Sequence, residues 1–209
     1  MSPGPATPTS LMPRITVRPA TQDDARFLVP LIDAAGEGLP SYLWARLAQP
    51  GQIPAEVGLA RVEGETATVS WRHARVAEFD GRPAGCCYAC RLPDPPATPT
   101  ATPTETLPGD LPPMFVPLQQ LENEAAGTGY VNILATASAF RRRGVGRALL
   151  ASAEETAGPR GMSVIVSDGN PGARRLYERL GYAVTDRRPM VKEGWRGHGR
   201  AWLLMIKAP

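Results

Sequence analysis

The segment of residues 130–146 constrains the fold of this chain more than any other part of the sequence. It combines an apolar strand pattern, a short polar turn, the motif R-x-x-G-x-G and the start of a helical pattern. Gly144 and Gly146 let the backbone approach a ligand closely, because they carry no Cβ atom. The first amides of a helix lack intrahelical acceptors and lie at its positive end. The segment therefore predicts a strand, loop and helix that bind a pyrophosphate.

Three consecutive arginines, Arg141, Arg142 and Arg143, add positive charge to this loop. A Walker A loop is excluded, because no Lys-Ser or Lys-Thr follows the glycines. A dinucleotide-binding fingerprint needs a third glycine and an acidic residue about 20 positions further on, and neither fits. The arginines by themselves leave open a solvated face or a nucleic-acid patch.

Proline clusters mark the segments that do not belong to the core. Residues 1–13 are rich in Pro, Ser and Thr, and we expect a disordered tail there. The Pro- and Thr-rich stretch at 93–112 cannot bury a core, and it predicts a mobile insertion. Neither flank of the insertion is long enough to fold separately, so residues 14–209 are expected to form a single domain.

Composition limits the other function classes. A net charge of +3 is too weak to indicate nucleic acid as a partner. No apolar run reaches the roughly 18 residues of a membrane span, and the first residues lack a signal-peptide pattern. We therefore expect a cytoplasmic protein without a membrane partner. The cysteines at 86, 87 and 90 indicate buried strand residues, and no second Cys or His pair follows to predict a metal site.

Hydrophobic periodicity predicts an α/β or α+β fold with helices on both faces of a sheet. The expected order is one strand, two helices, three strands, then a helix, a strand, a helix and two strands. The expected strands are 15–18, 68–79, 83–92, 130–136, 161–167, 182–191 and 200–207. The expected helices are 21–35, 40–50, 144–157 and 170–180, with a further short helix at 117–123 left open.

Two motifs, in the usual order and at the usual separation, resemble the GNAT superfamily of acyl-CoA-dependent N-acetyltransferases. The first covers 133–150 and contains the arginine- and glycine-rich loop. The second covers 170–182 and is an Asn before a helix that ends in Tyr-x-x-x-Gly-Tyr. The resemblance is strong over 128–185, and residues 15–24 also look like the family's first strand and helix start. It implies a GNAT-like mixed central sheet of about seven strands, flanked by helices on both faces.

The resemblance also implies acetyl-CoA as the acyl donor. The backbone of the strand before the loop would pair with pantetheine, and the loop amides would hold the pyrophosphate. Asn170 would contact the pantetheine arm, although it also suits the cap of a helix that begins at Pro171. The implied cofactor-binding residues are Leu134, Ala135, Thr136, Arg141, Arg142, Arg143, Gly144, Val145, Gly146, Arg147 and Asn170.

For the chemistry, the resemblance favours Tyr177 as the proton donor to the departing thiolate and Glu122 as the general base. The alternatives are a packed aromatic ring for Tyr177 and an exposed helix residue for Glu122. Glu124, His73 and His198 are the other candidates for the base. Tyr42, Trp44 and Phe115 are candidates for an apolar acceptor pocket, or else ordinary core aromatics.

The sequence thus predicts an N-acetyltransferase that transfers an acetyl group from acetyl-CoA to a primary amine by direct attack in a ternary complex. The alternative is a non-catalytic acetyl-CoA-binding sensor module. The acceptor is expected to be a small molecule or a peptide and not nucleic acid, and its identity stays open. The oligomeric state also stays open, with a homodimer as one alternative.

Overall fold

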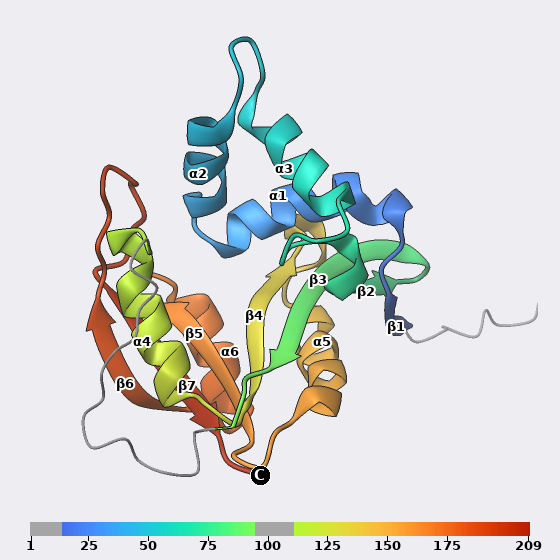
Figure 1. Ribbon diagram of the computed structural model, residues 1–209. Coiled ribbons are helices and arrows are strands. Elements are labelled where there is room, and N and C mark those ends of the chain that lie inside the picture. The colour runs from blue at the N-terminus through green and yellow to red at the C-terminus, as the bar shows by residue number, and fades with distance from the viewer. Residues whose placement is uncertain (1–13, 95–110) are drawn as a thin grey trace, which may run out of the picture.

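The computed structural model of the chain describes residues 14–94 and 111–209. The predicted tail at 1–13 lies outside these residues, as does most of the predicted insertion at 93–112. Within the described part, seven strands form one mixed sheet with the order β1-β2-β3-β4-β5-β7-β6 (Figure 1). The strands are β1 (Ile15–Pro19), β2 (Ala74–Phe79), β3 (Arg82–Arg91), β4 (Gly129–Thr136), β5 (Met162–Ser167), β6 (Ala183–Pro189) and β7 (Ala201–Lys207). The predicted seven-stranded mixed fold is confirmed.

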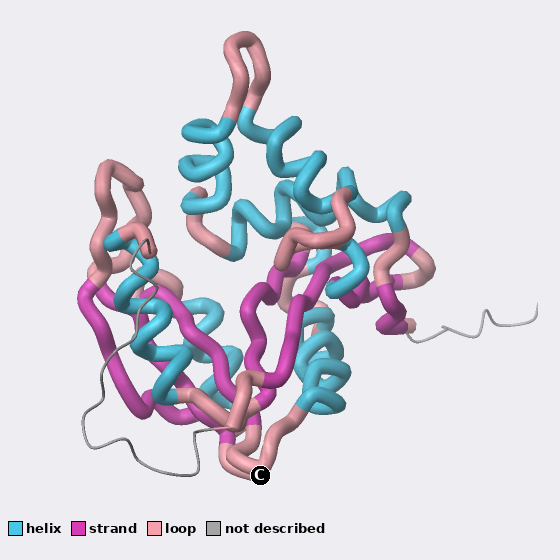
Figure 2. The backbone as a smooth tube through the Cα atoms, in the orientation of Figure 1, coloured by secondary structure: helices cyan, strands magenta, loops and turns pink. Residues whose placement is uncertain are grey.

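Helices cover both faces of this sheet (Figure 2). They are α1 (Ala25–Ala35), α2 (Leu39–Leu47), α3 (Pro54–Glu63), α4 (Val116–Glu124), α5 (Val145–Ala153) and α6 (Pro171–Arg179). Helices α5 and α6 pack on one face, where Leu149 and Tyr177 belong to the same core cluster as Val131 and Val164. The other face carries α1, α2 and α3 over β2 to β4, and α4 over β7. Each face therefore has its own hydrophobic core.

The N-terminal half contains one helix more than we predicted from the sequence. Helix α3 begins at Pro54, so a proline occupies its first turn. The side chain of Glu56 accepts a hydrogen bond from the Ile53 amide at 3.0 Å. Its apolar residues Val57 and Val62 are buried against α1 and α2. The strand expected from residue 68 starts only at Ala74. Packing against α1 and α2 stabilises this weakly amphipathic helix, whereas its own hydrophobic pattern was too weak to predict it.

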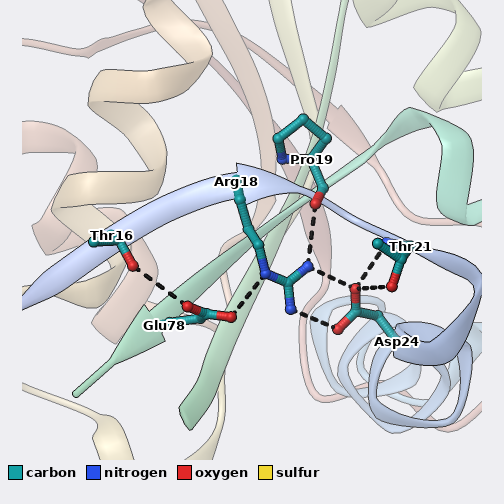
Figure 3. A network of polar contacts seen from close by, with 6 residues as sticks. All are labelled: Thr16, Arg18, Pro19, Thr21, Asp24 and Glu78. Carbon is teal, nitrogen blue, oxygen red and sulfur yellow. Dashed lines mark hydrogen bonds and ion pairs between the residues drawn. The ribbon is translucent and has the colours of Figure 1, made fainter. Parts of the chain in front are cut away.

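An ion-pair network fixes the start of α1 on the first strands (Figure 3). Arg18 donates two hydrogen bonds to the Asp24 carboxylate, at 2.8 and 3.0 Å, and one to Glu78 at 2.7 Å. Asp24 also accepts from the Thr21 amide at 2.8 Å. The Arg18 hydrogen bonds lower the pKa of Asp24 and outweigh the opposing effect of burial. This network is structural, because none of its members lines the cavity described below.

Two further expectations concern single features. Cys86 and Cys87 are buried on β3 as predicted, but Cys90 is exposed near the end of that strand. Burial raises the pKa of the Cys87 thiol to about 12. No helix in the described ranges is both long enough and apolar enough to cross a membrane.

Candidate active site

The central feature of the site is the separation of β4 from β5. The two strands are parallel and pair at only three positions, the last of which joins Val131 to Val164. Strand β4 continues to Thr136 and β5 continues to Ser167, but the two strands do not pair with each other beyond this point. The divergence coincides with a β-bulge, because Tyr88 and Ala89 of β3 face Ile133 and Val131 and leave Asn132 as the additional residue. A bulge bends a strand and increases its twist, so the second half of β4 presents unpaired backbone to the gap.

A cavity of about 1050 Å³ occupies this gap. Its wall consists of β4 and β5 in the middle, the loop before α5 together with α5 and α6 on one face, and the α1–α2 turn on the other face. The volume lies at the upper end of the range for ligand pockets, which suits a long, flexible ligand. The cavity therefore passes through the sheet at the point where the sheet is open.

The loop before α5 has the backbone geometry of an anion site. Arg142 has a φ of 61° and Gly144 a φ of 89°, so two left-handed residues turn the chain into the helix. Gly144 is the N-cap and supplies no side chain to the first amides of α5. A Cβ atom on Gly146 would lie 3.1 Å from Leu176 Cδ2 of α6, so only glycine leaves this approach uncrowded. The free amides and the positive helix end face the cavity, as an anion requires.

The arginines of the loop have different environments. Arg141, Arg142 and Arg147 line the cavity, together with Arg179 of α6. Arg141 Nε also donates to the Thr136 carbonyl at 3.4 Å. Arg143 lies outside the cavity, with its guanidinium 5.3 Å from the centre of the Phe79 ring. Leu134, Ala135, Thr136, Gly144, Val145 and Gly146 all line the cavity.

Helix α6 brings two of the predicted residues to the same wall. Asn170 is the N-cap, and its side chain accepts a hydrogen bond from the Ala173 amide at 3.1 Å, so the predicted cap is confirmed. Tyr177 lines the cavity and is otherwise buried, with its ring centre 5.8 Å from that of Tyr182. Burial raises the pKa of the Tyr177 hydroxyl, so the phenol keeps its proton at neutral pH and can act as a donor.

Glu122 lies apart from this cavity. It lines a second, smaller cavity of about 340 Å³ with Leu92, Pro93 and Gln119. Tyr130 forms a hydrogen bond with its carboxylate. Burial raises the pKa of Glu122, and the hydrogen bond opposes part of that effect. Its predicted role as the base stays a prediction, since the described structure gives it no place on the wall of the larger cavity.

The three aromatic candidates for acceptor binding also lie off the cavity wall. Trp44 is buried among α1, α2 and α3, where its ring leaves no room for a Cβ atom on Gly58. Phe115 packs against the hydrophobic cluster that contains Leu121 of α4 and Trp202 of β7. Tyr42 donates its hydroxyl hydrogen to the Glu193 carbonyl of the β6–β7 hairpin. Their acceptor role stays a prediction, and the contacts that we observe are structural.

Several polar residues of the cavity wall were missed by the sequence analysis, among them Asn132, Glu37 and Arg179. Asn132 interrupts an apolar strand with a polar side chain, and this could have signalled the bulge. Glu37 stands between two glycines at the end of α1, a pattern typical of a left-handed turn. Within the described ranges, no group of three or more His, Cys, Asp or Glu side chains is placed to hold a metal ion.

Comparisons with known proteins agree with this geometry. The Acetyltransferase (GNAT) family model matches residues 53–182, which is more than half of the chain. A solved structure described as an acetyltransferase superimposes with a TM-score of 0.59 at 16% identity and covers 92% of this chain and 98% of its own. An N-acetyltransferase from Staphylococcus aureus Mu50 gives a TM-score of 0.57 at 15% identity, over 91% and 99%.

A third similar structure carries ligands. Diaminobutyrate acetyltransferase EctA from Paenibacillus lautus, in complex with L-2,4-diaminobutyric acid and coenzyme A, gives a TM-score of 0.52 at 18% identity, over 94% of this chain and 96% of its own. Comparison with curated proteins finds no match. The open mixed sheet and the glycine-started helix, taken with these comparisons, define an acyltransferase enzyme. The chain belongs to the Acetyltransferase (GNAT) family, whose members use acetyl-CoA.

Proposed function

We propose that this chain is an N-acetyltransferase that binds acetyl-CoA in the cavity between β4 and β5 and transfers the acetyl group directly to a primary amine. The observation that supports this most is the continuity of the cavity, which runs from the unpaired edge of β4 to the free amides at the start of α5. A ligand with a peptide-like arm and a pyrophosphate needs both features in one groove. Four cavity arginines match its negative charge.

The residues take the following roles in this proposal. The edge of β4 that β5 leaves unpaired, along Leu134, Ala135 and Thr136, pairs with the pantetheine arm as an additional strand would. The amides of residues 142–147 and the positive end of α5 hold the pyrophosphate. Asn170 contacts the arm through its side-chain amide group, whose oxygen also caps α6.

Tyr177 supplies the proton to the leaving group. The amine nitrogen forms a bond to the acetyl carbon, the carbon–sulfur bond breaks, and the sulfur takes the proton of the phenol. The ammonium form of the amine gives up one proton to a base or to solvent before the attack, and the nitrogen loses a second proton after it. Tyr177 is reprotonated from solvent. The position of Tyr177 on the cavity wall supports this role. The phenol carries its proton at neutral pH, because the pKa of a free tyrosine is about 10 and burial raises it further.

The experiment that tests the proposal has two parts. Acetyl-CoA should raise the melting temperature of the protein, since a ligand at about 100 times its Kd adds roughly 2.7 kcal/mol to the stability. An amine panel with acetyl-CoA should then release free thiol with at least one acceptor. Stabilisation without thiol release would favour the non-catalytic binding module. Absence of stabilisation in a folded sample would refute the cofactor assignment.

A further inference from the structure

Glu37 occupies a backbone position that a glutamate adopts at a cost. It lies in the sequence Gly36-Glu37-Gly38 between α1 and α2, and its φ is 52°. Glycine adopts this left-handed region freely, whereas a side chain with a Cβ atom is strained there. Strained positions of this kind concentrate at functional sites, where the surrounding structure holds them in place. The strain calls for an explanation in terms of what the side chain does.

One oxygen of the Glu37 carboxylate also lacks a partner in the described structure. Its Oε2 atom is buried, and no residue in the described ranges donates a hydrogen bond to it. Burying a polar atom without a partner destabilises a fold. Glu37 lines the large cavity, and it is the single acidic residue among the described residues of that wall. The site thus contains a buried acceptor of hydrogen bonds beside a space that a ligand can enter.

The charges of the cavity are separated across the sheet. The four cavity arginines, Arg141, Arg142, Arg147 and Arg179, belong to the loop before α5, to α5 itself and to α6, on one face. Glu37 belongs to the α1–α2 turn on the opposite face. A polyanionic acyl donor is attracted to the arginines and repelled by a carboxylate. Glu37 therefore faces the side of the gap that remains for the second substrate.

We propose that Glu37 binds the ammonium group of the acceptor, and that the acceptor class is an alkylamine, which carries a positive charge at neutral pH. This inference rests on the acetyl transfer proposed above and names the substrate class for the same cavity. An ammonium group supplies the hydrogen-bond donors that the carboxylate lacks. A neutral arylamine supplies weaker donors and no charge, so the site discriminates against it.

The β6–β7 hairpin holds Glu37 in place for this task. Trp195 Nε1 donates a hydrogen bond to the Glu37 carbonyl at 3.1 Å, and Trp195 stacks on Trp202 with the ring planes 5° apart. The backbone of the turn is thereby fixed from a second part of the chain. The side chain, in contrast, is left for a ligand.

The test compares Glu37→Gln with wild type in thiol-release assays on putrescine, Nα-acetyl-lysine and the shape-matched pair benzylamine and aniline. For the best alkylamine, KM should rise about 10- to 100-fold, the loss expected for a charged hydrogen bond. The KM for acetyl-CoA should not change. Glu193→Gln is the matched control, because Glu193 also has a positive φ of 43° but is exposed. It should leave the KM of the alkylamine unchanged.

Stability separates this role from a structural one. Glu37→Gln and Glu37→Gly should both melt at or above the wild-type temperature, because they remove an unpaired carboxylate and, for glycine, the strain of the turn. A lower melting temperature with an unchanged KM for the alkylamine would overturn the proposal, as would equal use of aniline and benzylamine by the wild type. Failure of every amine, with acetyl-CoA binding intact, would favour the non-catalytic binding module and refute the acetyl transfer on which the inference rests. Failure of acetyl-CoA to bind would also refute the acetyl transfer on which it rests.

Discussion

The indole Nε1 of Trp195 donates a hydrogen bond to the backbone carbonyl of Glu37 at 3.1 Å, across 158 positions of the chain. This contact joins the β6–β7 hairpin to the α1–α2 turn, two segments that lie beside the open gap of the sheet. Tyr42 strengthens the same junction through its hydrogen bond to the Glu193 carbonyl. The wall of the cavity on this face therefore depends on contacts between distant parts of the sequence.

Trp195→Phe should loosen that wall. It keeps an aromatic ring to pack on Trp202 but removes the donor to Glu37, so we expect a stability loss of about 1–3 kcal/mol. The KM of the acceptor should rise while that of acetyl-CoA stays constant. Denaturant unfolding and thiol-release kinetics measure the two effects. Trp71→Phe is the control, because Trp71 lies in the short helical turn just before β2 and does not line the cavity. An unchanged acceptor KM in Trp195→Phe would show that the hydrogen bond does not shape the site.

Gly146→Asp should abolish stabilisation by acetyl-CoA. The new side chain places a negative charge at the start of α5 and a Cβ atom 3.1 Å from Leu176 Cδ2. Gly146→Ala adds the same Cβ atom without the charge, and it should retain a weakened shift in melting temperature. Thermal unfolding with and without saturating acetyl-CoA measures both. Full stabilisation of the Asp variant would mean that the pyrophosphate binds elsewhere.

Tyr177→Phe should lower turnover and leave acetyl-CoA affinity unchanged. Loss of a proton donor costs roughly 10²–10⁴-fold in rate. We expect the low end, because a thiol has a pKa near 8.5 and its thiolate leaves readily. The matched control is Tyr182→Phe, since the Tyr182 hydroxyl is buried without a partner in the described structure and its ring lies beside Tyr177. That control should keep its turnover, and equal turnover in the two variants would remove Tyr177 from the mechanism.

Asp24→Asn should destabilise the fold in a pH-dependent manner. Its hydrogen bonds from Arg18 lower the folded-state pKa below the unfolded value of about 3.9. A depressed carboxylate pKa contributes stability above the unfolded value, and this contribution is lost as pH falls through the folded pKa. The substitution should therefore cost about 1–3 kcal/mol at neutral pH and progressively less below about pH 4. Denaturant midpoints measured across pH give the comparison.

The control for Asp24 is Asp94→Asn. Asp94 pairs with Arg91 at 3.0 Å, but both side chains are more than half exposed. Exposed pairs contribute between zero and about 1 kcal/mol. A loss in Asp94→Asn as large as that in Asp24→Asn would indicate a general charge effect and would contradict the role of the network in Figure 3.

Local chemistry made part of the site predictable. Gly144 can adopt the left-handed φ that starts α5, and the first amides of that helix have no partner within it. The cap at Asn170 and the periodicity around Leu149 are likewise properties of short segments. The loop before α5, α5 itself and α6 could therefore be predicted from neighbouring residues, whereas the family was predicted from the resemblance of two motifs to the GNAT superfamily.

Partners from distant segments were not predictable in the same way. Glu122 lies within the short helix considered at 117–123, but the packing of α4 directs it to Tyr130 and to a separate cavity. Helix α3 depends on burial against α1 and α2, since its own pattern is weak. The bulge at Asn132 exists only relative to the register of β3.

The sequence by itself determined the strand, loop and helix that we propose as the anion site, because glycine freedom, helix-end amides and hydrophobic period act within a few residues. Only the tertiary structure decided that β4 and β5 separate after Val131, and that the resulting cavity joins four arginines on one face to Glu37 on the other. Pairing and burial are interactions between segments that are distant in the sequence, such as the α1–α2 turn and the loop before α5. The role that we propose for Glu37 depends on the residues around it in space, and the local sequence does not specify those residues.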